Sequence, residues 1–95
     1  MGRYSIDKIP SDVLEELAER HRLTRKAAGY SQAELATRAG VSLGSLKRFE
    51  HTGQVSLESL LKLLHVLNRL EDMNHVLAPR HLEDAARLFS DTTRR

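Results

Sequence analysis

This chain has two groups of side chains that could hold a metal ion or transfer protons: its five histidines and the carboxylates of one acidic segment. The acidic segment contains Asp12, Glu15 and Glu16, at a helix start where the helix dipole favours anions. The histidines are His21, His51, His65, His75 and His81. No two of them are four residues apart and none stands in a His-Glu-x-x-His motif, so the spacing does not favour a metal site. With no Gly-rich phosphate loop, nucleophile elbow or paired-carboxylate cleft, we expect no metal, no cofactor and no enzymatic activity.

The composition is typical of a single ordered domain. The chain has 95 residues, of which 40% are hydrophobic and 29% charged, and it contains no cysteine. Disulfides and thiolate metal sites are therefore excluded, and a reducing cytoplasmic location is expected. The richest apolar run, LESLLKLLHVLNRL, is too short and too charged to span a membrane. The net charge of +2 is only a weak indication of a polyanionic partner, so a nucleic acid would be bound by a local patch.

Helix caps, glycine and proline breaks, and apolar residues at helical spacing predict an all-α fold. Pro10-Ser11-Asp12 indicates the start of the first helix, with Ser11 as its N-cap. Ser31 and Glu34 have the spacing of a capping box, which opens the second helix. The expected helices cover about residues 11–28, 31–39, 42–51, 56–68, 69–77 and 80–90. The expected domain organisation is an N-terminal arm (1–10), a main domain (11–78) and a C-terminal helix with a frayed tail (79–95).

The segment 31–51 contains two short helices separated by very few residues. Helices this short are marginal alone in water, so each must pack against the other and against the rest of the chain. Ala36 must be small because the next helix crosses over it, and Gly40 allows the positive φ that a tight turn needs. The residues expected to face one core are Leu35, Val41, Leu46 and Phe49. This combination predicts a helix-turn-helix, whose second helix suits the major groove of DNA.

The chain resembles the phage-repressor-like (XRE, lambda-repressor-like) helix-turn-helix family in the pattern R-x-x-x-G-x-S-Q-x-E-L-A-x-x-x-G-V-S-x-x-x-L-x-x-x-E, and the likeness covers Arg25 to about Leu67. The resemblance implies a five-helix domain whose third helix contacts the DNA bases. In this chain an additional short C-terminal helix follows the five. It implies a phosphate contact for Gln32 and a buried ion pair between Arg25 and Glu50, which would fix geometry more than it adds stability. The remaining DNA-contacting positions that it implies are Ser42, Leu43, Gly44, Ser45, Lys47 and Arg48.

Three features depart from the family pattern. Gly44 is unusual inside a recognition helix, where it costs about 1 kcal/mol relative to Ala. It either permits a close approach to DNA or leaves one base position unread. The loop HTGQV is longer than the commonest Glu-x-Gly turn of the family, and His21 and Thr24 stand where many relatives carry aliphatic residues.

The helix expected over 56–68 carries more apolar residues than one buried face needs. The residues expected to fill the core are Leu57, Leu60, Leu61, Leu64 and Leu67. Leu63, Val66 and Leu70 are expected to point away from this core, and Met73 and Leu77 extend the same apolar set further along the chain. Either the last two helices cover this second set or it forms a dimer interface, and we favour the interface because apolar surface left on a small domain tends to bind a partner.

Three functions fit these observations. The first is a homodimeric transcriptional repressor that reads a palindromic operator in double-stranded DNA. The second follows from the segment RFE-x-T-G-x-V-S-L-E-x-L-L-x-L, which is similar to HipB-like antitoxins and implies a HipA-like kinase toxin as partner and autoregulation of the operon. The third is a protein–protein adaptor without DNA binding. Salt-dependent DNA binding would separate the adaptor from the other two, and none of the three requires a membrane.

Overall fold

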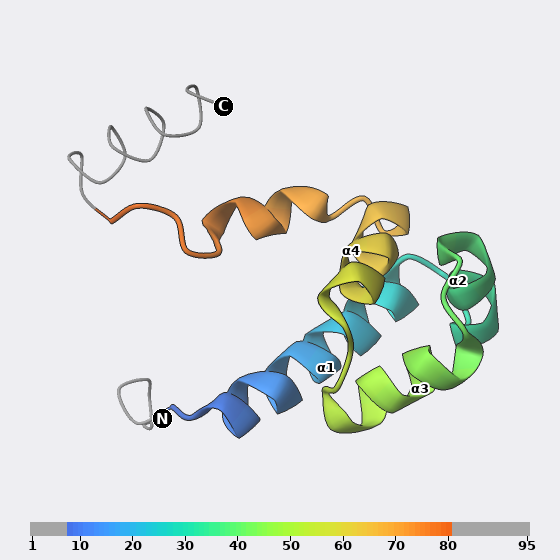
Figure 1. Cartoon of the computed structure of the whole chain (residues 1–95). Coiled ribbons are helices and arrows are strands. Elements are labelled where there is room, and N and C mark those ends of the chain that lie inside the picture. Colours follow the sequence, from blue (N-terminus) through green and yellow to red (C-terminus); the bar gives the residue numbers. More distant parts are fainter. Residues whose placement is uncertain (1–7, 81–95) are drawn as a thin grey trace.

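The computed structural model describes residues 8–80, and the regular elements of this part of the chain are all helices (Figure 1). No strand occurs within it, so the predicted all-α fold is confirmed. The elements are α1 (Pro10–Ala27), α2 (Gln32–Ala39), α3 (Leu43–Thr52), α4 (Leu57–Val66) and the 3-10 helix η2 (Leu70–His75). Most of the predicted N-terminal arm and almost all of the helix predicted over 80–90 lie outside the described residues.

Helix α1 begins one residue before the predicted start and is not capped by Ser11. Ile9 is the N-cap residue, with extended backbone angles, and Pro10 is the first helical residue. Asp12 accepts a hydrogen bond from the backbone N–H of Ile9 through Oδ2 at 3.1 Å. The prediction of Ser11 as the cap is wrong because proline itself suits the first helical position, where its missing N–H removes no helical hydrogen bond.

Helices α2 and α3 begin at the predicted caps. The Ser31 hydroxyl accepts a hydrogen bond from the Glu34 N–H at 3.0 Å, and the Glu34 carboxylate accepts one from the Ser31 N–H at 3.0 Å. The Ser42 hydroxyl caps α3 by accepting from the Ser45 N–H at 3.1 Å. Gly40 ends α2 with φ at 72°, in the left-handed region that glycine adopts without strain. The chain therefore turns within residues 40–42, as the sequence predicts.

The core lies where α2, α3 and α4 meet, and α1 packs across α3 (Figure 1). The four core positions predicted from the helix-turn-helix are all buried, and so is Ala36, which confirms how α2 and α3 pack. The buried residues of this cluster are Leu35, Ala36, Val41, Leu46, Phe49, Leu60, Leu63 and Leu67. Phe49 and Leu46 have no exposed surface, so the inner side of α3 is fixed in the core.

Helix α4 buries Leu60 and Leu67 as predicted, but the rest of its buried face differs from the prediction. Leu63, expected to point away from the core, has no exposed surface, and Leu57, expected inside, is 62% exposed. Leu60, Leu63 and Leu67 are spaced along one helix face, and that face meets α2. Both faces of α4 are apolar, so periodicity alone does not select the buried one. The prediction for Leu63 and Leu57 is therefore wrong.

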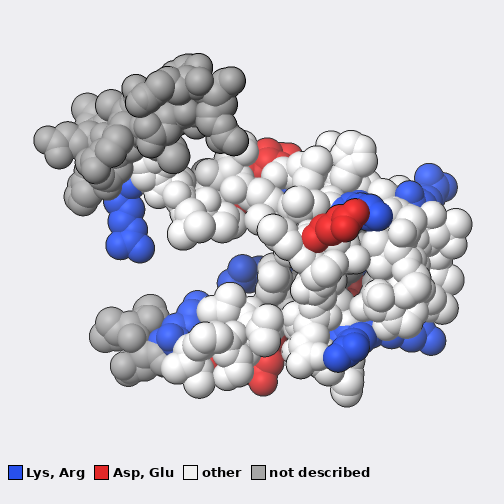
Figure 2. Space-filling model, viewed as in Figure 1, with Lys and Arg blue, Asp and Glu red and all other residues white. Residues whose placement is uncertain are grey.

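The short helix predicted over about 69–77 is present as the 3-10 helix η2. Asn68 adopts a positive φ of 63° directly after α4, which breaks the helical path. None of the residues of η2 is buried. Together with α1, η2 borders an open groove of about 710 Å³ whose walls are mainly apolar, and Figure 2 shows the molecule hollowed between these two arms.

Within residues 8–80, no helix has the length and apolar character needed to cross a membrane.

Candidate nucleic-acid interface

Helix α3 has one anchored side and one free side. Its inner residues Leu46 and Phe49 are fully buried. The exposed residues on and before its outer side are Ser42, Leu43, Gly44, Ser45, Lys47 and Arg48, the same positions for which the resemblance implies DNA contact. Lys and Arg side chains lie over α3 in Figure 2. The structure thus gathers these positions on one accessible surface, while the core fixes the helix that carries them.

The first turn of α3 combines hydroxyl groups with a missing side chain. The Ser42 hydroxyl donates to the Ser45 hydroxyl at 2.9 Å, which leaves the Ser45 O–H free to donate to a ligand. Gly44 has an ordinary helical backbone, and a Cβ built on it meets no atom within 4 Å. Neither backbone geometry nor packing within the described chain therefore requires a glycine at this position.

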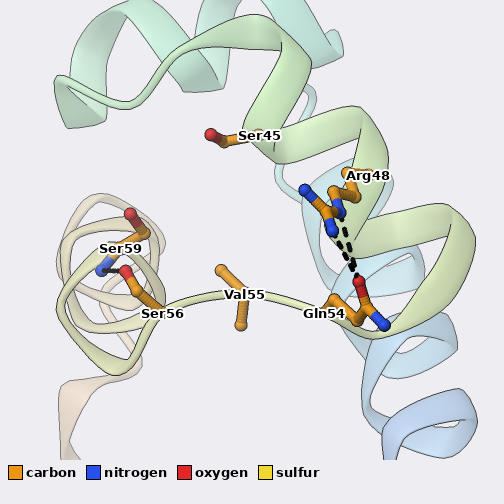
Figure 3. Close-up of a pocket in the computed structure, with 6 residues that line it drawn as sticks. All are labelled: Ser45, Arg48, Gln54, Val55, Ser56 and Ser59. Atoms are coloured by element: carbon orange, nitrogen blue, oxygen red, sulfur yellow. Dashed lines mark hydrogen bonds between the residues drawn. The ribbon is translucent and has the colours of Figure 1, made fainter.

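Arg48 lies against the loop between α3 and α4. Its Nε and Nη2 atoms donate to Oε1 of Gln54 at 3.2 and 2.9 Å (Figure 3). The residues that line a hollow of about 300 Å³ beside this pair are Ser45, Arg48, Gln54, Val55, Ser56 and Ser59. Sequence reasoning did not identify Gln54, and the only signal for it is the long loop HTGQV that contains it.

The Glu50 carboxylate joins α1, α2 and α3. Oε2 lies 2.9 Å from Nε of Arg25 and 2.8 Å from Nδ1 of His21. Oε1 accepts from Nη2 of Arg25 at 2.9 Å and from Nε2 of Gln32 at 3.0 Å. The guanidinium also donates from Nη1 to the Tyr30 carbonyl at 2.9 Å. The structure therefore places Arg25 and Glu50 in a bidentate pair inside a four-residue cluster.

This cluster changes the interpretation of two residues. Gln32 stands at the start of α2, where a phosphate contact was expected, but its amide donates to Glu50 and its side chain is half-buried. One of its two amide hydrogens is therefore already used within the protein. His21, a departure from the family pattern, is buried between Glu50 and Phe49. The centroids of the His21 and Phe49 rings are 4.8 Å apart. Only the tertiary arrangement shows this role for His21.

The charges of the cluster follow from its burial and its hydrogen bonds. Burial alone would raise the pKa of Glu50, but hydrogen bonds from Arg25, Gln32 and His21 outweigh it and hold the pKa below its ordinary value. Burial lowers the pKa of His21, and the Glu50 carboxylate opposes this only in part. The neutral His21 ring must then carry its proton on Nδ1 to donate to the carboxylate. Its Nε2 atom is buried without a hydrogen-bond partner among the described residues.

The residues predicted for a dimer interface do not form one continuous exposed surface. Leu63 is fully buried and Val66 packs against the core, so neither is freely available to a partner. Met73 lines the groove between α1 and η2, whereas Leu70 is exposed on η2. Leu77 is 95% exposed beyond it. The exposed part of the predicted set therefore lies on and after η2.

Comparison with known proteins agrees with this geometry. The family model described as helix-turn-helix matches residues 22–72, which is more than half of the chain. The matched range contains Arg25, Glu50 and the whole of α2, α3 and α4. Neither the curated proteins nor the solved structures give a match. The chain belongs to the phage-repressor-like (XRE) helix-turn-helix family of DNA-binding regulators.

Proposed function

We propose that the protein is a sequence-specific transcriptional repressor that inserts α3 into the major groove of its operator. The observation that carries this proposal is the division of α3 into a side with no exposed surface at Leu46 and Phe49 and an opposite side that is free. A groove about 12 Å wide admits one such helix. The Glu50 cluster supports the proposal because it ties α3 to α1 and α2 and so limits its orientation.

Each exposed side chain of α3 suits one kind of contact. The guanidinium of Arg48 suits a base edge, and the ammonium of Lys47 suits a phosphate. Leu43 can touch a thymine methyl group, and the Ser45 hydroxyl can donate to a phosphate or a base. Gln32 contributes a phosphate contact through its second amide hydrogen or through the N-terminus of α2.

Specific binding also calls for a second copy of the chain. A single helix reads only a few base pairs, and two-fold dimers solve this by placing two such helices about 34–36 Å apart on one face of the DNA. We place the dimer contact on η2 and the residues after it, at Leu70, Met73 and Leu77, with Val66 at its edge. Leu63 is excluded because it is fully buried.

The antitoxin alternative keeps the same DNA contacts and adds a partner. The mainly apolar groove between α1 and η2 favours some protein contact beyond DNA. In the repressor that contact serves the dimer, and in a HipB-like antitoxin it would serve a kinase-type toxin. Co-purification of the protein with such a kinase would separate the two functions, and both place the protein with the chromosomal DNA in the cytoplasm.

Selection of duplexes from a randomised pool tests the central proposal. The full chain is expected to enrich an inverted repeat whose half-sites are centred about one helical turn apart. Binding to that sequence should weaken steeply as salt is raised, because phosphate contacts release counterions. A folded protein that enriches no sequence and shows no salt-dependent binding to duplex DNA would contradict the proposal.

A further inference from the structure

Arg48 and Gln54 act as one unit at the edge of α3 (Figure 3). Two N–H groups of the guanidinium, on Nε and Nη2, converge on the single oxygen Oε1 of the amide at 3.2 and 2.9 Å. A guanidinium carries five donors and no acceptor, so the amide oxygen and not its nitrogen must face it. The orientation of the Gln54 amide is therefore set by its partner.

The loop between α3 and α4 fixes the backbone position of Gln54. The Thr52 hydroxyl donates to the Arg48 carbonyl at 2.8 Å and accepts from the Gln54 N–H at 3.1 Å. Gly53 lies between them with φ at 86°, and a Cβ on it would stand 2.6 Å from Cβ of Leu14 in α1. The loop thus packs directly on α1, and Gln54 is presented to Arg48 by a fixed backbone rather than by a flexible tether.

This pairing removes the acceptor from the surface. The amide oxygen has two lone pairs, and the two guanidinium donors occupy them. What remains free is Nη1 of Arg48, the second hydrogen on its Nη2, and the amide nitrogen of Gln54, all of which are donors. A free glutamine reads adenine by using its oxygen and its nitrogen together, and Gln54 cannot do so while its oxygen is engaged.

A surface that offers donors alone selects among the four bases. In the major groove guanine presents two acceptors, N7 and O6, whereas adenine presents one acceptor and one donor. Cytosine presents a donor, and thymine a single acceptor beside a methyl group. Two adjacent donors therefore match the edge of guanine best.

The position on α3 favours a base edge over a phosphate. Arg48 lies four residues after Gly44 and three after Ser45, so the three share one face of the helix. Gly44 adds no side chain to that face, and apart from its own helix backbone and chain neighbours no atom of the described residues lies within 4 Å of the place its Cβ would take. Gly44 therefore places no side chain between α3 and the floor of the groove.

We propose that Gln54 is a specificity-determining positioning residue, which holds Arg48 so that the protein selects guanine at one position of each half-site. This inference rests on the proposed DNA binding by α3. It adds to that function a loop residue outside the helix-turn-helix and the identity of one recognised base. Gln54 acts through Arg48 and is not required to touch DNA itself.

Two substitutions at one position test this role. Gln54→Leu keeps the approximate size and removes the acceptor, whereas Gln54→Glu keeps an acceptor that binds the guanidinium more strongly. The wild-type full chain and both variants are used in selections from the same randomised duplex pool, followed by affinity measurements on duplexes that differ at the guanine position. Thermal melting of each protein confirms that it is folded, which is expected because Gln54 is exposed.

The expected pattern differs between the two variants. Gln54→Leu should lose discrimination for guanine by about five-fold or more, the lower end of what a bidentate arginine–guanine pair provides. Gln54→Glu should keep the guanine preference while binding all duplexes more weakly, because its charge repels phosphates. Such a rescue of selectivity by the conservative variant would not follow from a merely structural role of the loop.

Three results would overturn the inference. Undiminished guanine selection by Gln54→Leu would show that Arg48 needs no positioning. If Arg48→Ala weakens binding equally for every sequence and lowers the salt slope by about one, Arg48 binds a phosphate instead of a base. If the folded wild-type protein itself enriches no sequence, the proposed function fails and the inference fails with it.

Discussion

Helix α1 borders two regions that differ in how completely their side chains find partners. Toward α3, His21 and Arg25 are buried and bonded to Glu50, and the carboxylate accepts from three different side chains. Toward η2, Val13 and Leu23 are 45% and 52% exposed along an open apolar groove. The first region therefore fixes the orientation of the proposed reading helix within one chain. The second is left open among residues 8–80, as expected of a surface that a partner covers.

The largest effect on stability is expected from a substitution at Glu50, the centre of the region between α1 and α3. Glu50→Ala would leave the buried Arg25 without its counter-charge and should lower the free energy of unfolding by about 3–5 kcal/mol. Removing both residues together should be less damaging than removing Glu50 alone, because no uncompensated charge remains. Urea unfolding of the wild type, Arg25→Ala, Glu50→Ala and the double variant gives the coupling energy.

A matched control uses an exposed ion pair of the same helix. Glu19 pairs with Arg22 on the surface of α1, so Glu19→Ala is expected to leave the melting temperature nearly unchanged. A cycle in which the effects of Arg25→Ala and Glu50→Ala simply add would reject the importance of the buried pair.

The next effect concerns the contact between the α3–α4 loop and α1. Gly53 and Gly29 have nearly the same positive φ, 86° and 87°, but only Gly53 has Leu14 within contact of a new Cβ. Gly29→Ala should therefore cost about 1 kcal/mol for backbone strain alone. Gly53→Ala should cost roughly 1–3 kcal/mol more, because the loop must move away from α1.

Comparing the two variants separates packing from strain. Unfolding free energies measured under identical conditions give the difference directly. Equal losses at Gly29 and Gly53 would mean that the loop does not pack on α1 as described.

A smaller effect is expected from pH, through His21. Burial lowers its pKa, so the unfolded chain takes up a proton at a higher pH than the folded one. The stability that neutral His21 gives is therefore complete above about pH 6.5 and is lost as the pH falls below that value, by at most about 1.4 kcal/mol per pH unit. Glu50, whose pKa is also lowered, loses its contribution only below about pH 4.5.

Unfolding free energies between pH 7.5 and pH 5 measure this contribution, and the range lies above the titration of Glu50. His21→Asn should flatten the pH dependence, whereas His51→Asn, at an exposed position of α3, should retain it. Identical slopes in the wild type and His21→Asn would show that His21 is not responsible.

The contrast between the two regions also explains what the sequence predicts well. Caps and turns depend on residues close together in the chain, so Ser31, Glu34, Gly40 and Ser42 locate α2 and α3 correctly. The core of the helix-turn-helix follows as well, because each of its positions has one steric requirement. The start of α1 at Pro10 is less clearly specified by the sequence, because serine as N-cap and proline as first helical residue compete for the same boundary.

Features that depend on distant packing could not be predicted. Two stripes of leucine on α4 are equally apolar, and only the position of α2 decides that Leu63 is buried. The role of His21 requires α1 and α3 to lie side by side, which no local pattern specifies. The pairing of Arg48 with Gln54 depends on how one loop packs on α1, so the sequence indicated only that the loop is long.

Substitutions on η2 and after it, beside the open groove, are expected to have the smallest effect on folding and a large effect on dimerisation. Leu70 and Leu77 are 40% and 95% exposed, so replacing both by Glu removes little buried surface from one chain. The unfolding free energy of the monomer should change by no more than about 0.5 kcal/mol. If these residues form the dimer contact, two pairs of charges would then enter an apolar interface, and the proposed dimer should dissociate.

Light scattering at micromolar concentration measures this difference between assembly and folding. The wild type is expected to be a dimer, and the Leu70→Glu, Leu77→Glu variant a folded monomer with weaker DNA binding. Leu57→Glu is the matched control, because Leu57 is 62% exposed on α4 and does not line the groove, so this variant should remain dimeric. A monomeric wild type would reject the dimer, and a dimeric double variant would move the interface away from η2. Only loss of the dimer without loss of the fold would show that this side of α1 and η2 is completed by a second chain.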